Sequence, residues 1–340
     1  MRRLVLFLAI VLVLFTGAAV FDWWVDPFGQ VWKPDVLSAA RAKNCLVSQE
    51  LIGDRYWAFK HDVFSHRPTR SFVVGSSRVL KMAAAPGETS FANLGYPGTS
   101  PKTILALLRS LTAKPAQTVY IGVEPFWFNA NGYNLDVGDL SPWKELEYLL
   151  ARKTFTRAIT LSRESAQLPL HRWRVDELGG KCVLDRFVPA ISWRTDGSRV
   201  WGFELDPKRF PRFTASPFRG DLATWRNGYY ANWQRLDPKR IQTLVDALDL
   251  ARRRGWKVVG FTPPEPPHML HVLETDPRLA PQWRMFTETM PKLFRQRGFR
   301  WVDTSNGAQL GCKPSDFPDA FHSDARCSAL LRYALRSGAG

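Results

Sequence analysis

The chain contains 340 residues, of which 45% are hydrophobic and 23% charged, a composition typical of a globular protein with a sizeable core. Its 47 basic and 31 acidic residues give a formal net charge of +16, which favours anionic partners such as nucleic acid, anionic lipid or acidic polymers. The basic residues are scattered and no nucleic-acid-binding motif accompanies them, so we predict no nucleic-acid partner.

The N-terminus has the pattern of a membrane-spanning segment. Arg2 and Arg3 precede an apolar run from Leu4 to Phe15, and the first acidic residue is Asp22. A basic flank before an apolar stretch stays on the cytoplasmic side of a membrane. The remainder of the chain is therefore predicted to lie outside the cytoplasm, in the periplasm or the extracellular space.

Two fates of this segment remain open. Residues 4–24 nearly reach the ~20 residues that a spanning helix needs, and Trp23 and Trp24 suit an interfacial aromatic belt. Gly17 and Ala19 could instead provide the small residues of a signal-peptidase site. We favour a retained anchor over residues 1–24, because of its length and its aromatic belt.

Residues 25–70 are predicted to form a juxtamembrane segment, with a turn at Asp26–Gly29 and a helical stretch around 35–60. Strands are predicted at 71–74, 91–95, 118–123, 256–261 and 299–303, and helices at 101–111, 237–255, 281–297 and 323–335. This alternation predicts a three-layer α/β/α domain over residues 71–340, with a parallel central sheet. Such sheets place their sites at the carboxyl ends of the strands.

Residues 129–235 break the alternation and are interpreted as an insertion over the strand ends. A helix is predicted at 141–168, and the remainder is rich in proline and arginine. The tryptophans of this region are Trp143, Trp173, Trp193, Trp201, Trp225 and Trp233. Tryptophans either pack inside a protein or stack on sugar rings, and packing is the commoner role because indole buries a large area.

Four cysteines are present: Cys45, Cys182, Cys312 and Cys327. An even number in a predicted oxidising compartment favours disulfides, although free buried thiols are the alternative. No Cys-x-x-Cys pair occurs, which excludes zinc-ribbon and thioredoxin-like sites. Cys312 and Cys327 bracket a polar motif near the C-terminus and are predicted to pair.

Candidate catalytic residues lie at two places in the sequence. Ser77 follows the strand 71–74 on a sharp turn, where the next backbone N–H groups can face an oxyanion, and Ser76 is the rival nucleophile. Of the six histidines, His322 has the best-placed carboxylate, Asp319, three residues before it. Asp319 can hold one ring nitrogen and support the imidazolium. A capping aspartate beside a surface histidine is the alternative.

Taken together, these motifs resemble the SGNH (GDSL-like) hydrolase superfamily. The first block of that family is matched by Gly75–Ser77, the second by Asn93–Gly98 and the last by Asp319-x-x-His322, in the order that the family has them. The resemblance covers about residues 71–340, apart from the insertion.

The resemblance implies a role for each matched residue. Ser77 would be the nucleophile, His322 its base and Asp319 the group that orients the base. The backbone N–H groups of Ser77 and Gly98 would form the oxyanion hole, and Ser76 would line the site.

One block departs from the family pattern. The third block carries an asparagine that donates to the oxyanion, whereas Ile121–Pro125 has Glu124 there. An ionised carboxylate cannot donate, and losing one donor typically costs about 10²–10³ in rate. Either another donor substitutes, with Arg78 the nearby candidate, or the protein is not a fast hydrolase.

The Gly-Ser-Ser-Arg turn and the segment Asp26–Gly29 resemble a membrane-anchored branch that includes alginate O-acetylation and teichoic acid D-alanylation proteins. This resemblance implies a Ser-dependent acyl transferase or esterase acting on a cell-surface glycan, beside a membrane-bound O-acyltransferase. A non-catalytic envelope-assembly or glycan-binding protein is the alternative, and Glu124 favours it. No metal or nucleotide cofactor is predicted, because the sequence has neither a phosphate-binding loop nor a His/Cys ligand cluster.

Overall fold

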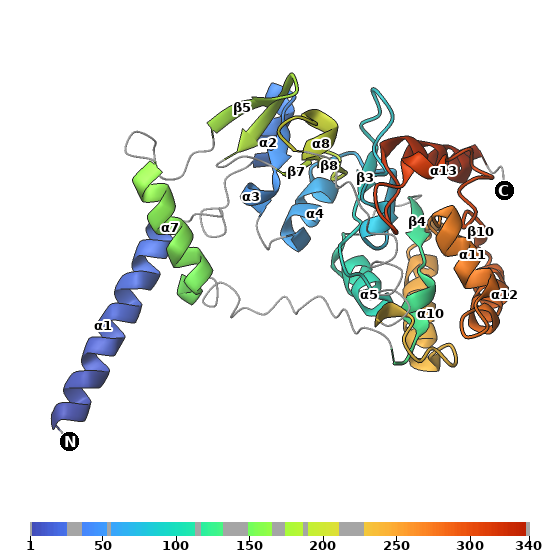
Figure 1. The fold of residues 1–340 in the computed structure, drawn as a ribbon, viewed down its shortest axis with the longest axis horizontal. Coiled ribbons are helices and arrows are strands. Elements are labelled where there is room, and N and C mark those ends of the chain that lie inside the picture. The colour runs from blue at the N-terminus through green and yellow to red at the C-terminus, as the bar shows by residue number, and fades with distance from the viewer. Residues whose placement is uncertain are drawn as a thin grey trace. The chain divides into compact units, whose positions relative to one another are not determined.

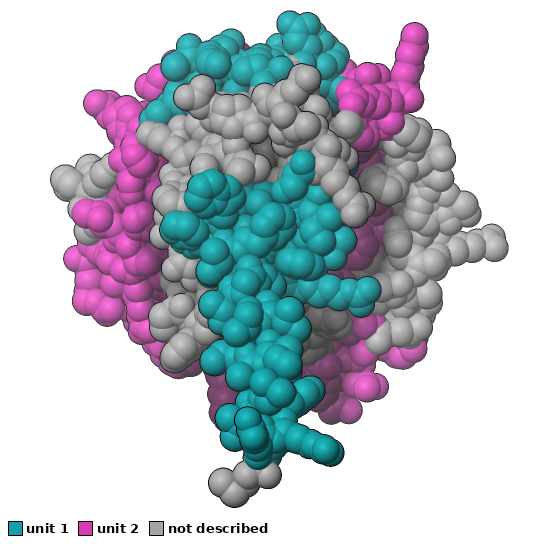
Figure 2. Space-filling view, turned by 90° about the vertical axis from the view of Figure 1, so that its left-hand side faces the viewer, with its two compact units in different colours: residues 1–56, 138–192 teal, residues 57–137, 193–340 magenta. Residues whose placement is uncertain are grey.

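The computed structural model describes residues 2–25, 36–52, 56–112, 117–131, 149–164, 174–185, 190–210 and 228–337. The chain divides into two compact units, residues 1–56 with 138–192 and residues 57–137 with 193–340, which are coloured separately in Figure 2. Residues 138–192, which fall within the predicted insertion at 129–235, are grouped with the juxtamembrane chain in the first unit. The expected turn at 26–29, parts of the helix at 141–168, and Trp143, Trp173 and Trp225 lie outside the described residues.

The first unit begins with the apolar helix α1 (Arg2–Val25), which is long and apolar enough to cross a membrane (Figure 1). Its apolar side chains are exposed along most of its length. Helix α7 (Arg152–Glu164) packs on its carboxyl-terminal end. The rings of Phe21 and Phe155 lie 6.0 Å apart, edge to face, and Val25 is buried against Ala158.

The remainder of the first unit contains short strands and two short helices. The strands are β1 (Leu46–Ser48), β5 (Arg174–Leu178) and β6 (Lys181–Asp185), and the helices are α2 (Val36–Lys43) and α3 (Gln49–Ile52). Strands β5 and β6 form an antiparallel hairpin, and β1 runs parallel to β6. A disulfide joins Cys45, just before β1, to Cys182 on β6, so the juxtamembrane chain and residues 174–185 are covalently linked.

The second unit contains the predicted parallel sheet. Its strands are β2 (Ser71–Val74), β3 (Phe91–Asn93), β4 (Thr118–Gly122), β9 (Lys257–Phe261) and β10 (Arg300–Val302). The order across the sheet is β10-β9-β4-β2-β3, with every neighbouring pair parallel, which confirms the α/β fold class. The chain reverses direction across the sheet at β2 and β4, and a doubly wound sheet binds its ligands outside the carboxyl ends of such strands.

Helices cover both faces of this sheet. On one face, Val73, Tyr120 and Val259 pack with Leu331 and Leu335 of α13 (Ala325–Ser337). On the other face, the ring of Phe64 in α4 (Tyr56–Ser65) meets Phe72 edge to face at 5.4 Å. Phe294 of α12 (Ala280–Arg295) packs there against Trp301, at 5.0 Å between ring centroids.

The connecting helices begin at recognisable caps. The side chain of Ser100 caps α5 (Pro101–Ser110), and that of Asp237 caps α10 (Pro238–Arg253), each followed by a proline at the first helical position. The turn that carries Ser77 is a single 3-10 turn, η1 (Ser77–Val79). The remaining described elements are η2 (Pro125–Phe128), β7 (Ile191–Trp193), β8 (Arg199–Trp201), α8 (Gly202–Leu205), α11 (Pro267–Thr275) and η4 (Pro314–Asp316).

Candidate active site

The turn after β2 places two consecutive serines in different surroundings. Gly75 has φ +157°, and a Cβ there would lie 3.1 Å from the carbonyl oxygen of Gly122. Only glycine fits where the end of β2 passes so close to the end of β4. Beyond it, Ser76 is buried, whereas Ser77 is partly exposed at the start of η1.

A chain of hydrogen bonds joins Ser77, His322 and Asp319, which are brought together across 245 positions. Nε2 of His322 lies 2.8 Å from Oγ of Ser77, and its Nδ1 lies 2.7 Å from Oδ2 of Asp319. An ionised carboxylate only accepts hydrogen bonds, so Nδ1 carries the proton and Nε2 accepts from the Ser77 hydroxyl. This is the arrangement of a serine activated by an adjacent base that a carboxylate orients.

The loop itself fixes the position of Asp319. Its Oδ1 accepts the backbone N–H groups of Phe321, at 2.8 Å, and His322, at 2.7 Å. The tight turn from Asp319 to His322 therefore holds the carboxylate at the imidazole that it orients. Asp319 therefore caps this turn through Oδ1 and orients the imidazole of His322 through Oδ2.

The pKa values of this pair move in the directions that a base at neutral pH requires. Burial lowers the pKa of His322, although the hydrogen bond and the charge of Asp319 act to raise it, and the net effect is a lowered pKa. Burial acts to raise the pKa of Asp319, but the hydrogen bond and charge of His322 and the two backbone N–H groups together outweigh burial and lower that pKa. His322 is thus neutral and Asp319 ionised at pH 7.

Ser76 faces away from His322 and belongs to a second network. Its hydroxyl donates to Oε1 of Glu124 at 2.5 Å and accepts the backbone N–H of Arg78 at 3.1 Å. Glu124 is buried, and its Oε2 lies 2.7 Å from the guanidinium of Arg78. The charge of Glu124 is therefore compensated by the guanidinium of Arg78.

The guanidinium of Arg78 also binds groups from two other segments. Its Nη1 lies 2.7 Å from Oε1 of Glu265, and its Nη2 donates to the carbonyl oxygens of Pro263 and Pro264 after β9. Its Nε donates to the carbonyl oxygen of Phe321, the neighbour of His322. Burial alone would lower the pKa of Arg78, but its two carboxylate partners outweigh burial and raise it.

Glu265 is a site residue that sequence reasoning missed. Burial, aided by the charge of Glu124, raises its pKa against the opposing effect of Arg78. The one signal in the sequence is its place directly after Pro263 and Pro264, at the carboxyl end of a predicted strand. Acidic residues in that position are common, so the signal by itself selects no partner.

The glycine loop after β3 is tied to the nucleophile turn. The backbone N–H of Tyr96 and the hydroxyl of Thr99 both donate to the carbonyl oxygen of Gly75, each at 2.9 Å. Gly98, between them, has φ +73°, a value that favours glycine. Among the described residues, the N–H groups of Ser77 and Gly98 make no backbone hydrogen bond, so both remain available as donors.

An aromatic and basic cluster lies on another side of His322. The ring of Trp201 is 6.3 Å from the imidazole, edge to face, and the guanidinium of Arg199 lies 4.0 Å over Trp201. Lys81 is 5.4 Å from the same ring and forms an ion pair with Glu204. Burial lowers the pKa of Lys81 to about 7 against the opposing effect of Glu204. Of the described tryptophans in the predicted insertion, Trp193 and Trp233 are packed inside, while Trp201 is partly exposed.

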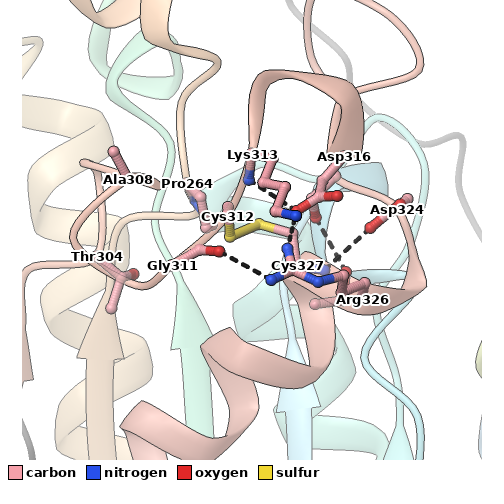
Figure 3. Close-up of a disulfide and its surroundings, with 12 residues drawn as sticks. Pro264, Thr304, Ala308, Gly311, Cys312, Lys313, Asp316, Asp324, Arg326 and Cys327 are labelled. Carbon is pink, nitrogen blue, oxygen red and sulfur yellow. Dashed lines mark hydrogen bonds and ion pairs between the residues drawn. A yellow bond between two sulfur atoms is a disulfide. The ribbon is translucent and has the colours of Figure 1, made fainter.

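A disulfide braces the loop that carries Asp319 and His322 (Figure 3). Cys312 and Cys327 are bonded, with 5.1 Å between their Cα atoms. Asp316 lies within this loop, where it accepts the backbone N–H of Lys313 and forms an ion pair with Arg326. These contacts are grouped around the disulfide in Figure 3.

No group of His, Cys, Asp and Glu side chains that could hold a metal ion occurs among the described residues. No known protein family and no curated protein sequence matches the chain. Among solved structures, the chain is similar to a Streptococcus pneumonia protein provisionally named a platelet activating factor. The two are 10% identical, with a TM-score of 0.43, over 90% of this chain and 99% of that one.

Asp319→Asn tests the electrostatic link between the carboxylate and the imidazole. The charge and hydrogen bond of Asp319 raise the pKa of His322, so their loss should lower that pKa further. A pH titration of the imidazole by nuclear magnetic resonance measures the change. The control Asp246→Asn, on α10, should leave the pKa of His322 where it is. An unchanged or raised pKa in Asp319→Asn would contradict the assigned contact.

Removing the disulfide should destabilise the second unit. Cys312→Ser with Cys327→Ser opens a loop with a sequence separation of 15, which should lower the free energy of unfolding by about 3 kcal/mol. Denaturant unfolding of the full chain in detergent measures it through the transition midpoint. Cys45→Ser with Cys182→Ser is the matched control, since that disulfide lies in the other unit. An unaltered second-unit transition in the first variant would refute a bracing role.

Proposed function

We propose that the second unit is an SGNH-type serine acyl-transfer enzyme, an acyl (acetyl) transferase or esterase with Ser77 as its nucleophile. The observation that carries this proposal is the hydrogen-bond chain Ser77–His322–Asp319, with 2.8 Å and 2.7 Å between the bonded atoms. The place of Ser77 after β2 supports the proposal further. The strand order reverses between β2 and β4, and ligands of such sheets bind at the carboxyl ends of the strands there.

The hydrogen bonds between Ser77, His322 and Asp319 determine where each proton goes in the proposed reaction. Oγ of Ser77 attacks the acyl carbonyl while His322 Nε2 takes the hydroxyl proton, and the resulting oxyanion accepts from the N–H groups of Ser77 and Gly98. The leaving oxygen then takes the proton from Nε2, and the acyl group remains esterified to Ser77. A sugar hydroxyl or a water next attacks this ester and gives its proton to His322. Transfer of that proton from His322 to Oγ of Ser77 releases the product and restores Ser77.

The ion pair of Glu124 bears on the rival proposal of a non-catalytic binding protein. An unpaired carboxylate beside the oxyanion would oppose the developing charge. Glu124 instead binds the Arg78 guanidinium and accepts the Ser76 hydroxyl, so its charge is compensated. The missing third donor still argues for a reaction about 10²–10³ slower than that of a complete oxyanion hole. A slow transferase fits this site better than a fast hydrolase.

We propose a cell-surface glycan as the acyl acceptor. Trp201 supports this proposal, because a partly exposed indole beside the base offers a face on which a sugar ring can stack. The net charge of +16 is compatible with an acidic polymer. We further propose a membrane-bound O-acyltransferase as the partner that supplies the acyl group.

We propose that α1 is a retained single-pass anchor and that the rest of the chain is extracytoplasmic. Its length, its exposed apolar side chains and the basic residues at its start support this orientation. Two disulfides suit an oxidising compartment.

Ser77→Ala tests the nucleophile directly. A fluorophosphonate probe should label the detergent-solubilised full chain at Ser77, and the variant should lose this labelling completely. Ser76→Ala is the matched control, because Ser76 bonds Glu124 and Arg78 and not the base. It should keep labelling, because neither of the two hydrogen bonds that it loses involves Ser77 or His322. Equal labelling of Ser77→Ala and the parent, or loss only in Ser76→Ala, would eliminate Ser77 as the nucleophile.

The anchor is tested by the mass and the accessibility of the mature protein. Intact mass spectrometry of the membrane fraction should find residues 1–24 still attached, after the chain has resisted alkaline carbonate extraction. Protease added outside the cytoplasmic membrane should digest the chain beyond residue 25. A mature N-terminus near residue 20 would establish signal-peptide cleavage, and full protection from protease would reverse the topology.

A further inference from the structure

We propose that the N-terminal end of α7 is a second membrane contact, which lies in the outer-leaflet headgroup layer beside α1 and binds anionic phospholipid. The proposal rests on α1 being a retained anchor. It concerns the first unit alone and is independent of the chemistry at Ser77.

The contacts between the two helices define the direction of α7. Phe155 meets Phe21, and Ala158 meets Val25, so the contacts advance in the same sense along both helices. Helix α7 can be followed beside the carboxyl-terminal end of α1 in Figure 1. Its N-terminal end at Arg152, with Leu150 just before it, therefore points back along α1, toward the membrane.

The depth of this contact follows from the length of α1. Twenty-four residues at 1.5 Å each give a helix of about 36 Å, against a hydrocarbon core of about 30 Å. With Arg2 and Arg3 at the inner surface, Phe21 lies near the outer boundary of the hydrocarbon. Phe155, which packs on it, must lie at about the same depth.

The exposed side chains at the start of α7 and just before it suit that depth. Leu150 is 44% exposed and Phe155 is 39% exposed, so both present apolar surface that no described residue covers. Arg152 is also exposed, and a long basic side chain there can reach the lipid phosphates while its stem lies among the acyl chains. An apolar and basic helix end of this kind is typical of interfacial segments.

Net charge favours anionic lipid over zwitterionic lipid. Helix α7 carries four basic residues, Arg152, Lys153, Arg157 and Arg163, against the single acid Glu164. An anionic lipid surface attracts basic residues that lie near it. The two contacts, a spanning helix and an interfacial helix end, would hold the first unit against the bilayer.

The experiment measures the depth of α7 with the full chain in lipid nanodiscs. All four native cysteines are in disulfides, so Leu150→Cys or Ser162→Cys introduces one thiol for an environment-sensitive fluorophore. Ser162 is the matched control, because it is exposed on α7 about 15 Å beyond Arg152 at the membrane end of the helix. Brominated acyl chains should quench the probe at 150 at least twofold more than the probe at 162. Equal quenching at the two positions would overturn the proposal.

The choice of lipid is tested by composition and by Arg152→Gln. Quenching at 150 should increase at least twofold when phosphatidylglycerol replaces part of the phosphatidylcholine, and Arg152→Gln should diminish this increase. Identical quenching in both lipids would overturn the anionic preference. Failure of the chain to insert in nanodiscs would overturn both the anchor and the α7 contact, while fluorophosphonate labelling of Ser77 would remain a separate outcome.

Discussion

The side chain of Arg78 uses all of its N–H groups inside the protein, and each partner comes from a segment that the site needs. Two are the carboxylates of Glu124 and Glu265, which follow β4 and β9, and the others are the carbonyl oxygens of Pro263, Pro264 and Phe321. Arg78 follows Ser77 directly, and Phe321 precedes His322. One rigid, planar cation therefore sets the distance between nucleophile and base. Removing one partner of such a buried pair typically costs about 3–5 kcal/mol.

This arrangement also explains how the buried carboxylate of Glu124 is accommodated beside the turn after β2. Two buried carboxylates share one guanidinium, and burial raises the pKa of Glu265. Ser76 adds a hydrogen bond to Glu124 and is thereby held away from the base. The two serines of the turn thus have separate tasks, one structural and one facing the imidazole.

The five parallel strands could be predicted because each is a short run rich in apolar residues, ending near glycine or proline. The pairing of Ser77 with His322 followed from the order of the motifs. Strands β5 and β6 could not be predicted, since Arg174–Leu178 and Lys181–Asp185 mix charged and apolar residues without a clear period. Glu265 was missed because its partner lies 187 positions earlier, and local sequence carries no trace of such a contact. The same reason applies to the disulfide between Cys45 and Cys182.

That disulfide has a mechanical consequence. It closes a covalent loop with a sequence separation of 137, and this loop contains Ser77 and Gly98, whereas His322 lies outside it. A pulling force between the N-terminal helix and the C-terminus would travel through the bond from Cys45 to Cys182 and bypass the backbone between them. The backbone of the nucleophile turn therefore carries no tension when the chain is pulled at its ends. The residues before Cys45 and those from Cys182 onward bear the load, except residues 313–326 around His322, which the bond from Cys312 to Cys327 bypasses in the same way.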